Sequence, residues 1–395
     1  SLGQLRRAVL RGRTVTRERL FLISMVRLFA KFDWILLLSA ALILLVGLLA
    51  LYSLSAAGGT NYFLKQSLFG VLGFGALFFV GSLDYRHIQR YSTLLYFVTV
   101  SVLLLVLLFG TTVNGTAGWL SFGFFQVQPV EVAKVTLIIF LASFISKKKS
   151  ELGEWTRVIA SLILSAVLIF LVLRQPDLGS SLVLASIWGG MILASGLRFK
   201  HFLVLGILGT LLVSGSWFLL ADYQKARIDT FLHPENDPQG SGYNVLQAMV
   251  AVGSGGISGK GLGYGSQSQL SFLPEKHTDF IYAVIAEELG MVGAWFVIAL
   301  YAVLLYRIRR IGMLASDNFG YLLSLGIMIM VFVQVLINLG MNVGLLPVTG
   351  LPAPFLSYGG SSLLSLSAAL GLLLSVYQRK KGVDDMRMSL ERSLL

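Results

Sequence analysis

The stretch Leu273-Pro274-Glu275-Lys276-His277-Thr278-Asp279-Phe280 closes the longest polar interval of the chain and leads directly into an apolar run that contains Glu287 and Glu288. A long apolar chain seldom keeps so many ionisable groups together unless they have a function. Asp279 or Thr278 would also suit the N-cap of the following helix, because both side chains accept hydrogen bonds from the first backbone N–H groups. Capping and catalysis are compatible, and the local sequence leaves both open.

The composition around this stretch is that of a membrane protein. Of the 395 residues, 56% are hydrophobic and only 13% are charged, and the mean hydropathy is +0.80. Such a chain has too few polar residues for a normal water-facing surface. Because cysteine is absent, disulfides, thiol nucleophiles and Cys-ligated metals are excluded.

Ten apolar runs reach or approach the roughly 20 residues that a membrane-spanning helix needs. They lie at 34–54, 62–81, 91–109, 129–145, 158–173, 180–197, 202–221, 280–305, 320–340 and 359–377. We therefore predict an all-α integral membrane protein with ten transmembrane helices and a large extracytoplasmic loop between the seventh and the eighth.

Lysine and arginine occupy the two tails and alternate connections, which indicates that these parts face the cytoplasm. The opposite connections carry almost no positive charge, with none in 55–61, 110–128 or 341–358. The formal net charge of +12 is thus a topology signal and not a nucleic-acid footprint, and the basic tails suit anionic membrane lipid. Both termini are predicted to be cytoplasmic, in a multi-pass protein of a cytoplasmic membrane.

We expect residues 1–395 to form a single membrane domain, with an interfacial segment at 1–33, the extracytoplasmic loop at 222–279 and a cytoplasmic tail at 378–395. A cleaved signal peptide is the alternative for the N-terminal segment, but the first apolar run is too long for one. Within the loop, residues 242–252 are apolar but too short to span, which predicts a re-entrant or surface helix. The dense glycines at 253–265 favour either a phosphate-cradling loop or a flexible connector.

The ionisable groups in or beside the predicted spans all fall in the outer half of the bilayer, and none is expected near the cytoplasmic end. These groups are Lys65, Glu131, Lys134, Asp177, Glu287 and Glu288. A solute pathway would place polar groups at every depth, so the one-sided cluster favours a site that opens outward. That compartment has no nucleotide supply, and an activated substrate would arrive attached to lipid.

Each of these groups also has a purely structural interpretation. Glu131 and Lys134 are three residues apart and would pair on one helix, although Lys134 would alternatively bridge to Asp177. One of Glu287 and Glu288 is expected to pair with a cation such as Lys65, while the other meets water. Asp279, beside Lys276 and His277 at the membrane boundary, is by position the best candidate for proton transfer.

Four motifs in this order resemble the SEDS family, which includes RodA, FtsW and SpoVE. They are Gln128-Pro129 with Glu131 and Lys134, Gln175-Pro176-Asp177-Leu178-Gly179, the 273–280 stretch with Glu287-Glu288-Leu289-Gly290, and Pro354-Phe355-Leu356-Ser357-Tyr358-Gly359-Gly360-Ser361. The resemblance implies a peptidoglycan glycosyltransferase that polymerises lipid II outside the membrane, with Asp279 as its essential acid. It also implies a partner, a class B penicillin-binding transpeptidase.

Details at 286–289 and 346–352 resemble RodA, which implies a role in cell-wall elongation and cell shape. Two positions depart from the family pattern. Gly118 stands before Trp119 where relatives commonly have Arg, and Val130 replaces the usual Ser before Glu131. If that Arg holds substrate phosphate in relatives, another group must do so here.

As a hypothesis, Asp279 is the general base that accepts the proton of the acceptor hydroxyl. The leaving pyrophosphate would be stabilised by Lys134, Lys65, Lys276 or Arg174, or by a transient Mg²⁺ or Mn²⁺; no resident cofactor or permanent metal site is expected. The remaining residues predicted to bind substrate are Glu131, Asp177, Trp119, His277, Glu287 and Ser357. The alternatives to a glycosyltransferase are a lipid II flippase and a non-catalytic scaffold of a cell-wall synthesis complex.

Overall fold

The computed structural model describes residues 32–58, 61–113, 116–121, 126–147, 154–194, 229–234, 240–270 and 272–380, together with residues 206, 225 and 237. Within these residues, eight helices are long and apolar enough to cross a membrane. They are α3 (Trp34–Gly58), α4 (Tyr62–Ser82), α6 (Ser92–Phe109), α7 (Pro129–Ser146), α8 (Glu154–Leu173), α14 (Ile281–Met313), α15 (Asn318–Asn342) and α16 (Gly360–Gln378).

A further apolar helix, α9 (Leu178–Ala194), is 17 residues long and matches the predicted run at 180–197. Nine predicted spans thus correspond to helices, and the tenth, at 202–221, lies outside the described residues except for Gly206. Helices suit these runs because a lipid environment offers the backbone no hydrogen-bond partners, so that every N–H and C=O must be satisfied within the segment. The prediction of an all-α, multi-span membrane fold is confirmed.

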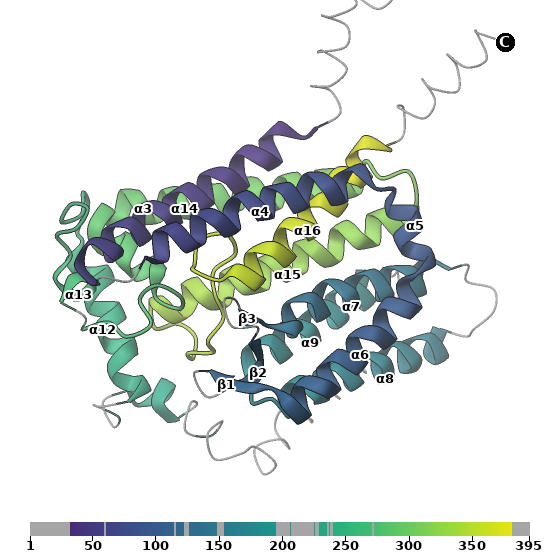
Figure 1. Ribbon diagram of the computed structural model, residues 1–395, viewed down its shortest axis with the longest axis horizontal. Helices are drawn as coiled ribbons and strands as arrows, with labels where there is room; N and C mark the ends of the chain where they lie inside the picture. The colour runs from purple at the N-terminus through teal and green to yellow at the C-terminus, as the bar shows by residue number, and fades with distance from the viewer. Residues whose placement is uncertain are drawn as a thin grey trace, which may run out of the picture.

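The helices form a bundle whose long axes run in broadly the same direction (Figure 1). Helix α16 lies along α4 through small residues. A Cβ added at Gly73 would stand 2.8 Å from the Ser367 hydroxyl, and one at Gly371 would stand 2.6 Å from the Leu77 carbonyl oxygen. Small residues let two backbones approach closely, which is the usual basis of helix packing in membranes.

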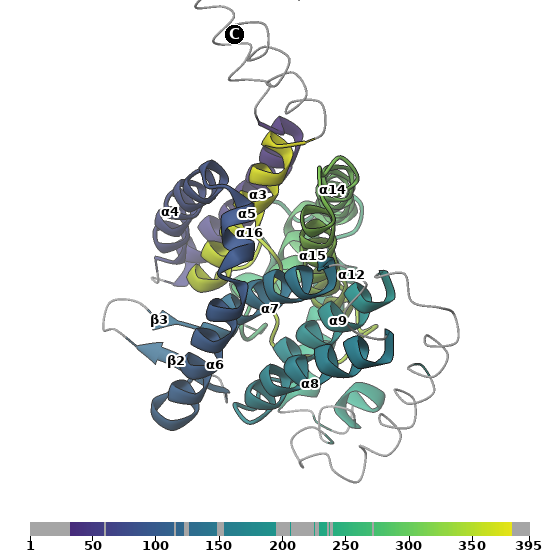
Figure 2. The same ribbon diagram turned by 90° about the vertical axis from the view of Figure 1, so that its right-hand side faces the viewer.

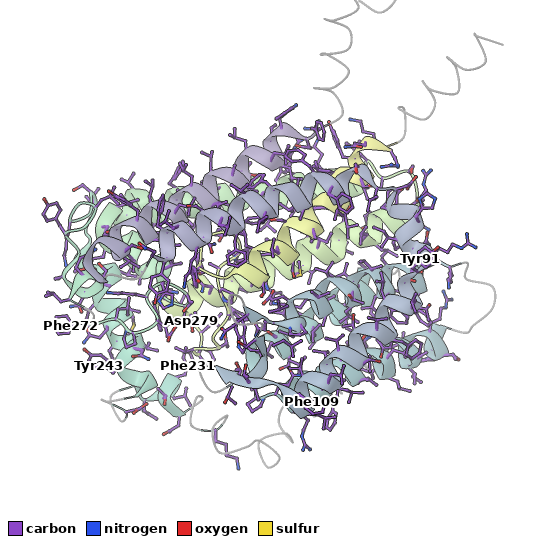
Figure 3. The ribbon with its side chains drawn as sticks, viewed as in Figure 1. Tyr91, Phe109, Phe231, Tyr243, Phe272 and Asp279 are labelled. Atoms are coloured by element: carbon purple, nitrogen blue, oxygen red, sulfur yellow. The ribbon has the colours of Figure 1, made fainter. Side chains whose placement is uncertain are left out.

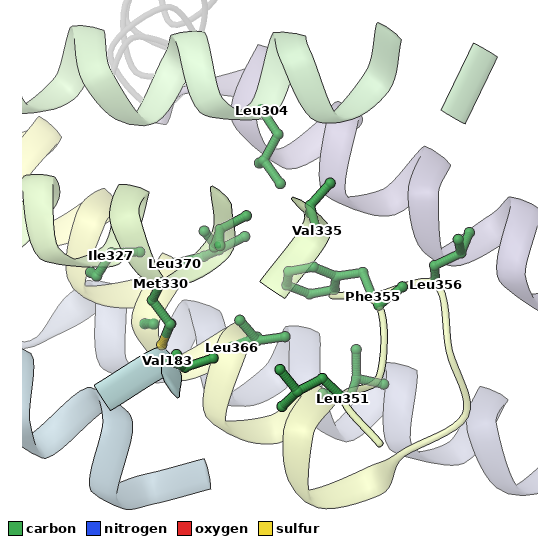
Figure 4. Close-up of a cluster of buried hydrophobic side chains, with 14 of the residues drawn as sticks. Val183, Leu304, Ile327, Met330, Val335, Leu351, Phe355, Leu356, Leu366 and Leu370 are labelled. Atoms are coloured by element: carbon green, nitrogen blue, oxygen red, sulfur yellow. The ribbon is translucent and has the colours of Figure 1, made fainter. Parts of the chain in front are cut away.

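The core lies where α14, α15 and α16 meet the connection that precedes α16. Leu304 of α14, Val335 of α15 and Leu366 of α16 surround Phe355 and Leu351 of that connection (Figure 4). The connection therefore enters the bundle from one end and is held there by apolar contacts. We call this end, which carries the connections predicted to face outward, the outer end, and the opposite end the inner end.

A small antiparallel sheet covers the outer end between α6 and α7, and the sequence analysis did not anticipate it. It consists of β1 (Thr111–Val113), β2 (Thr116–Ser121) and β3 (Gln126–Val127) in the order β1-β2-β3, with Thr111 opposite Trp119 and Leu120 opposite Val127. The signals were present in the sequence, because β-branched residues flank an Asn-Gly pair, the strongest hairpin signal. The strands are too short to stand out beside long apolar runs.

The large loop carries α12 (Ser241–Ser254) and the short α13 (Ser266–Gln269) at the outer end (Figure 1). Figure 2 shows α12 next to α15 in the view along the bundle. Helix α12 packs against α14 and α15 with Val245, Ala248 and Ala251 buried. The apolar segment predicted at 242–252 is therefore a helix that packs against the bundle at its outer end.

The glycine run has a role that neither sequence-based interpretation anticipated. Helix α14 is broken at Gly290, which has φ 68° and ψ −165°, and the glycine segment fills the break. Backbone N–H groups of Lys260 and Gly261 donate to the carbonyls of Glu287 and Glu288, each at 3.0 Å. These two N–H groups are engaged by protein carbonyls and are therefore not available to a phosphate.

The inner end contains buried charge, which contradicts the prediction that none would lie there. Asp33, just before α3, pairs with Arg307 of α14, and both residues are buried. Asp33 also accepts the Leu36 N–H at 3.0 Å and so caps α3. The short helix α5 (Tyr85–Arg90) also lies at the inner end. The hydroxyl of its first residue, Tyr85, donates to Asp317 at 2.8 Å. Sequence counting had assigned Arg307 to a connection because α14 extends further than predicted.

Candidate functional site

Asp279 lies at the outer end, at the entry to α14, and is half-buried (Figure 3). Its N–H donates to the carbonyl of Glu275 at 3.1 Å. Its own carbonyl accepts hydrogen bonds from the side-chain amides of Asn338 at 3.1 Å and Asn342 at 2.9 Å, both from α15. The main chain of the candidate base is therefore anchored on both sides of its Cα.

The N-terminus of α14 is capped from another helix. The residue before α14, Phe280, provides no side-chain cap, and the N–H of Ala283 instead donates to Oδ1 of Asn342 at 2.9 Å. The Thr278 hydroxyl donates to the carbonyl and the carboxylate of Glu275. The interpretation of Thr278 as the helix cap is therefore wrong, because its hydroxyl is directed to the preceding turn.

His277 lies in an aromatic cluster beside the candidate base. Its ring stacks on Tyr62 with centroids 4.2 Å apart, and the Tyr358 ring lies 5.8 Å away. Burial lowers the pKa of His277 below its ordinary value, although the Glu275 carboxylate opposes that shift. The imidazole is thus biased toward its neutral form. His277 therefore contributes to the turn as a packed ring and not as a cation.

Ser357, predicted to bind substrate, is a buried support for this turn. Its hydroxyl accepts the N–H of Ala353 at 2.8 Å and donates to the carbonyl of Thr278. The next residue, Tyr358, donates its N–H to the carbonyl of His277 at 2.9 Å. The connection before α16 is therefore bonded to the stretch that carries Asp279, while the Ser357 hydroxyl is used inside the protein.

Lys276 points away from the turn toward the loop. Its ammonium donates to the carbonyl of Ser268, and burial lowers the pKa of this amine, opposed by the nearby Glu288 carboxylate. A role for Lys276 at the substrate phosphate remains a prediction.

Glu131 and Lys134 of α7 form an ion pair of 2.8 Å with both side chains buried, so the predicted pairing is confirmed. The alternative bridge from Lys134 to Asp177 is wrong. Asp177 instead caps α9 by accepting the Ser180 N–H at 2.8 Å, and its other oxygen accepts from the Gln128 amide at 3.3 Å.

The segment 349–351 lies between the start of α9 and the turn that carries Asp279. A Cβ at Gly179, in the first turn of α9, would stand 2.8 Å from the Thr349 carbonyl oxygen. A Cβ at Gly350 would stand 3.9 Å from Oδ2 of Asp279. Gly350 has φ 75°, which a glycine adopts without strain. The segment therefore separates the start of α9, which carries Asp177, from the candidate base.

One of the two acids pairs with a cation, as predicted, but that cation is Lys260 and not Lys65, and the prediction that the other acid meets water is wrong. Glu287 is fully buried and pairs with Lys260 at 2.9 Å. Glu288 is 1% exposed and accepts from the Ser53 hydroxyl at 2.6 Å and the Gln269 amide at 2.9 Å. Lys65 is exposed on α4. The large loop folds back onto α14 and supplies partners that periodicity in the spans does not reveal.

Arg174 and Trp119 lie near the sheet side of the outer end. Arg174 is exposed, with its guanidinium 6.0 Å from the Phe170 ring centroid, and Trp119 is half-buried in β2. Gly118 is buried, and a Cβ there would stand 3.2 Å from the side-chain oxygen of Gln175. An arginine at this position would therefore require Gln175 to move.

Sequence reasoning missed several residues that shape this site, namely Tyr62, Lys260, Asn338, Asn342 and Tyr358. A signal for the asparagines was present, because two amides four residues apart in an apolar span lie on one helix face. Among the described residues, no group of three or more His, Cys, Asp or Glu side chains is arranged to hold a metal ion.

Comparison with known proteins gives the family. A model for FtsW, RodA and SpoVE, described as "Cell cycle protein", matches residues 32–382. Stage V sporulation protein E of Bacillus subtilis (strain 168) is 39% identical over 358 residues, which cover 87% of this chain and 96% of that protein. Peptidoglycan glycosyltransferase MrdB of Escherichia coli (strain K12) is 38% identical over 346 residues, covering 86% and 93%.

Two solved structures share the fold. One chain of a peptidoglycan synthase complex, described as coordinating polymerization and crosslinking, has a TM-score of 0.77 and 31% identity, covering 89% of this chain and 99% of its own. The rod shape determining protein RodA of Thermus thermophilus has a TM-score of 0.66 and 29% identity, covering 89% and 98%. The family match spans nearly all the described helices, and the chain therefore belongs to the FtsW, RodA and SpoVE family of multi-pass membrane proteins.

Proposed function

We propose that this chain, as a peptidoglycan glycosyltransferase of its family, polymerises lipid II at the outer face of the cytoplasmic membrane with Asp279 as the general base. Relatives named peptidoglycan glycosyltransferase support the activity. The observation that carries the assignment of the base is a half-buried carboxylate at the outer end whose main chain is fixed from both sides.

In the proposed reaction, Asp279 accepts the proton of the acceptor hydroxyl as that oxygen attacks the anomeric carbon of the donor sugar. The bond between that carbon and the pyrophosphate breaks, and the lipid pyrophosphate leaves with the electron pair. A base that is held in place supplies roughly 10²–10⁴-fold of rate. Fixing the main chain of Asp279 favours this role, because a small displacement of a reacting group costs much of the advantage of proximity.

The leaving group needs positive charge near its developing charge. Lys65 and Arg174 are exposed and have the reach of long side chains, whereas Lys134 is fully buried in its pair with Glu131. We therefore favour the exposed cations over Lys134 for direct contact with the pyrophosphate. A transient Mg²⁺ or Mn²⁺ carried by the phosphates is the alternative, and loss of activity on chelation with full recovery on adding either ion would support it.

Asp279→Asn tests the base directly. Purified protein in detergent, supplied with lipid II, should make glycan chains. The variant should polymerise at least about 100-fold more slowly while keeping its folded yield and melting temperature. Asp317→Asn, which changes an acid at the inner end, is the matched control and should polymerise normally. Wild-type rates from Asp279→Asn would contradict the assignment.

The same assay separates the enzyme from a lipid II flippase. In detergent there are no two leaflets, so transport produces no signal, whereas a polymerase produces glycan. A protein that makes no polymer with any partner but restores lipid II translocation in vesicles would favour the flippase.

We further propose a role in cell-wall elongation with a class B penicillin-binding transpeptidase as partner. The RodA-like segments at 286–289 and 346–352 support elongation, and the structural match to a peptidoglycan synthase complex supports a crosslinking partner. Stage V sporulation protein E, a relative named FtsW and MrdB are similarly close to this chain, at 39%, 36% and 38% identity. Expression in rod-shaped cells depleted of either RodA or FtsW tests the role: restored rod shape supports elongation, and restored septation supports division.

A further inference from the structure

Helix α15 presents two fully buried asparagines, Asn338 and Asn342, to the stretch that carries Asp279. They are four residues apart and therefore lie on one helix face. Both amide nitrogens donate to a single acceptor, the carbonyl oxygen of Asp279, at 3.1 Å and 2.9 Å. A backbone carbonyl with two lone pairs accepts two such bonds, so the acceptor is saturated by side chains from another helix.

Asn338 holds two segments at once. Its amide nitrogen, which has two hydrogens, donates to Asp279 and also to the carbonyl of Leu351 at 2.8 Å. Leu351 follows Gly350, and a Cβ added at Gly350 would stand 3.9 Å from Oδ2 of Asp279. One side chain thus fixes the acid and the segment that faces its carboxylate.

Asn342 uses both ends of its amide. Its nitrogen donates to Asp279, and its oxygen accepts the N–H of Ala283 in the first turn of α14. The first N–H groups of a helix have no partner within the helix and need one from outside. Asn342 therefore supplies the cap of α14 from α15 and fixes the main chain on the C-terminal side of Asp279.

Gln334, one turn earlier on α15, provides a contrast. It is 1% exposed, and neither its amide nitrogen nor its amide oxygen has a hydrogen-bond partner among the described residues. Burial of an amide in this helix therefore does not by itself imply a link to the 273–280 stretch. The two asparagines differ because each makes specific bonds to Asp279.

We propose that Asn338 and Asn342 are positioning residues for glycosyl transfer, which hold Asp279 and the 349–351 segment in the geometry that delivers the carboxylate to the acceptor hydroxyl. The inference rests on the proposed function. Both asparagines are fully buried and therefore closed to substrate, so their loss should slow the chemical step and leave substrate binding unchanged.

Asn342→Leu removes, at similar volume, the side-chain amide bonds to Asp279, Ala283 and the Asn338 carbonyl. We expect kcat for lipid II polymerisation to fall about 10–100-fold, the size of effect that small displacements of a reacting group produce, with KM within twofold of wild type. Gln334→Leu is the matched control, since it removes an amide of the same helix without touching Asp279, and it should keep wild-type kcat.

Hydrogen–deuterium exchange of the peptide covering 279–285 gives a readout that does not depend on catalysis. Exchange should be faster in Asn342→Leu and unchanged in Gln334→Leu. Wild-type kcat in Asn342→Leu, an equal loss in Gln334→Leu, or a change confined to KM would each overturn the proposal. If Asn342→Leu does not fold, Asn338→Leu carries the same comparison, because it also removes a donor to the Asp279 carbonyl. A wild-type protein that makes no polymer would refute the proposed function instead, while exchange would still test whether Asn342 anchors the turn.

Discussion

Asp279 and Glu287 lie on the same stretch of chain, about two helical turns apart, yet their surroundings are opposite. Asp279 is half-buried, and its main chain carries the anchoring contacts to α15. Glu287 is fully buried, and its carboxylate accepts from the ammonium of Lys260 and from the N–H groups of Gln267 and Ser268. Asp279 is thus fixed through its main chain, whereas Glu287 is fixed through its carboxylate by residues of the large loop.

The difference shows what each acid contributes. Oxygens that accept several N–H groups and an ammonium hold α13 and the glycine segment against the broken helix α14, so Glu287 belongs to the scaffold. The cost of burying such a charge is offset only when its partners are complete. The main-chain N–H and C=O of Asp279 are hydrogen-bonded to the Glu275 carbonyl and to the amides of Asn338 and Asn342. These bonds fix the turn, while the side chain of Asp279 remains partly exposed.

The largest expected effects come from exchanging the two acids for amides. Glu287→Gln removes the charge that pairs with Lys260 and weakens the bonds to Gln267 and Ser268, and we expect it to destabilise the fold by about 3 kcal/mol. Asp279→Asn should leave stability unchanged and reduce polymerisation at least about 100-fold. Melting temperature in detergent and lipid II polymerisation measured on both variants would sharpen the contrast.

The contrast would be broken by the opposite pattern. If Glu287→Gln melts like wild type, the carboxylate does not hold the loop. If it also loses activity as fully as Asp279→Asn at a temperature where both are folded, Glu287 acts in the reaction and the separation of scaffold from site is wrong.

The arrangement of the spans was readable from the sequence because it depends on physics local to each segment. Apolar runs of about the right length become helices in lipid, and the spacing of Glu131 and Lys134 predicted their ion pair, which the structure confirms. The sequence also placed the acids together at one end, because alternating spans return every second connection to the same side.

The partners of the acids were not readable in this way. Lys260 reaches Glu287 from a loop that folds back over α14, and no periodicity links the two positions. Asp33 and Arg307 are 274 positions apart in the sequence and pair because α14 extends to the inner end. Contacts between distant segments depend on how the bundle packs, whereas the spans depend only on their own residues.

A smaller loss of stability is expected from substitutions in the glycine segment, which packs against α14 beside Glu287 and Glu288. Gly259 has φ 79°, and a Cβ there would stand 2.1 Å from the Glu288 carbonyl oxygen. Gly259→Ala should therefore cost about 2 kcal/mol through overpacking and backbone strain. Gly256→Ala, with φ 58° but nothing within 4 Å of the added Cβ, carries the strain alone and should cost about half as much. Equal melting temperatures for the two variants would mean that close packing at the helix break is unimportant.

The smallest effect concerns pH and the Asp279 side of the comparison. Burial lowers the pKa of His277, with Lys276 acting in the same direction and Glu275 against it, while Tyr62 and Tyr358 pack on the ring. Below about pH 6.5, the ordinary value for histidine, the unfolded chain binds a proton that the folded protein resists. Stability from this group is therefore complete above that pH and is lost as pH falls toward the lowered pKa, with a slope of at most about 1.4 kcal/mol per pH unit for one proton.

His277→Phe keeps an aromatic ring against Tyr62 and removes the proton site, so the variant should lose less stability than wild type between pH 7.5 and about 5. Tyr62→Leu should act in the same direction by a different cause, since exposing the imidazole returns its pKa toward the ordinary value. Glu287 is not among the groups that shift the pKa of His277. Glu287→Gln should therefore keep the part of the pH dependence that arises from His277. If His277→Phe instead steepens the loss of stability in acid, the imidazole is held as a cation by Glu275, and the turn that carries Asp279 is stabilised by charge and not by packing.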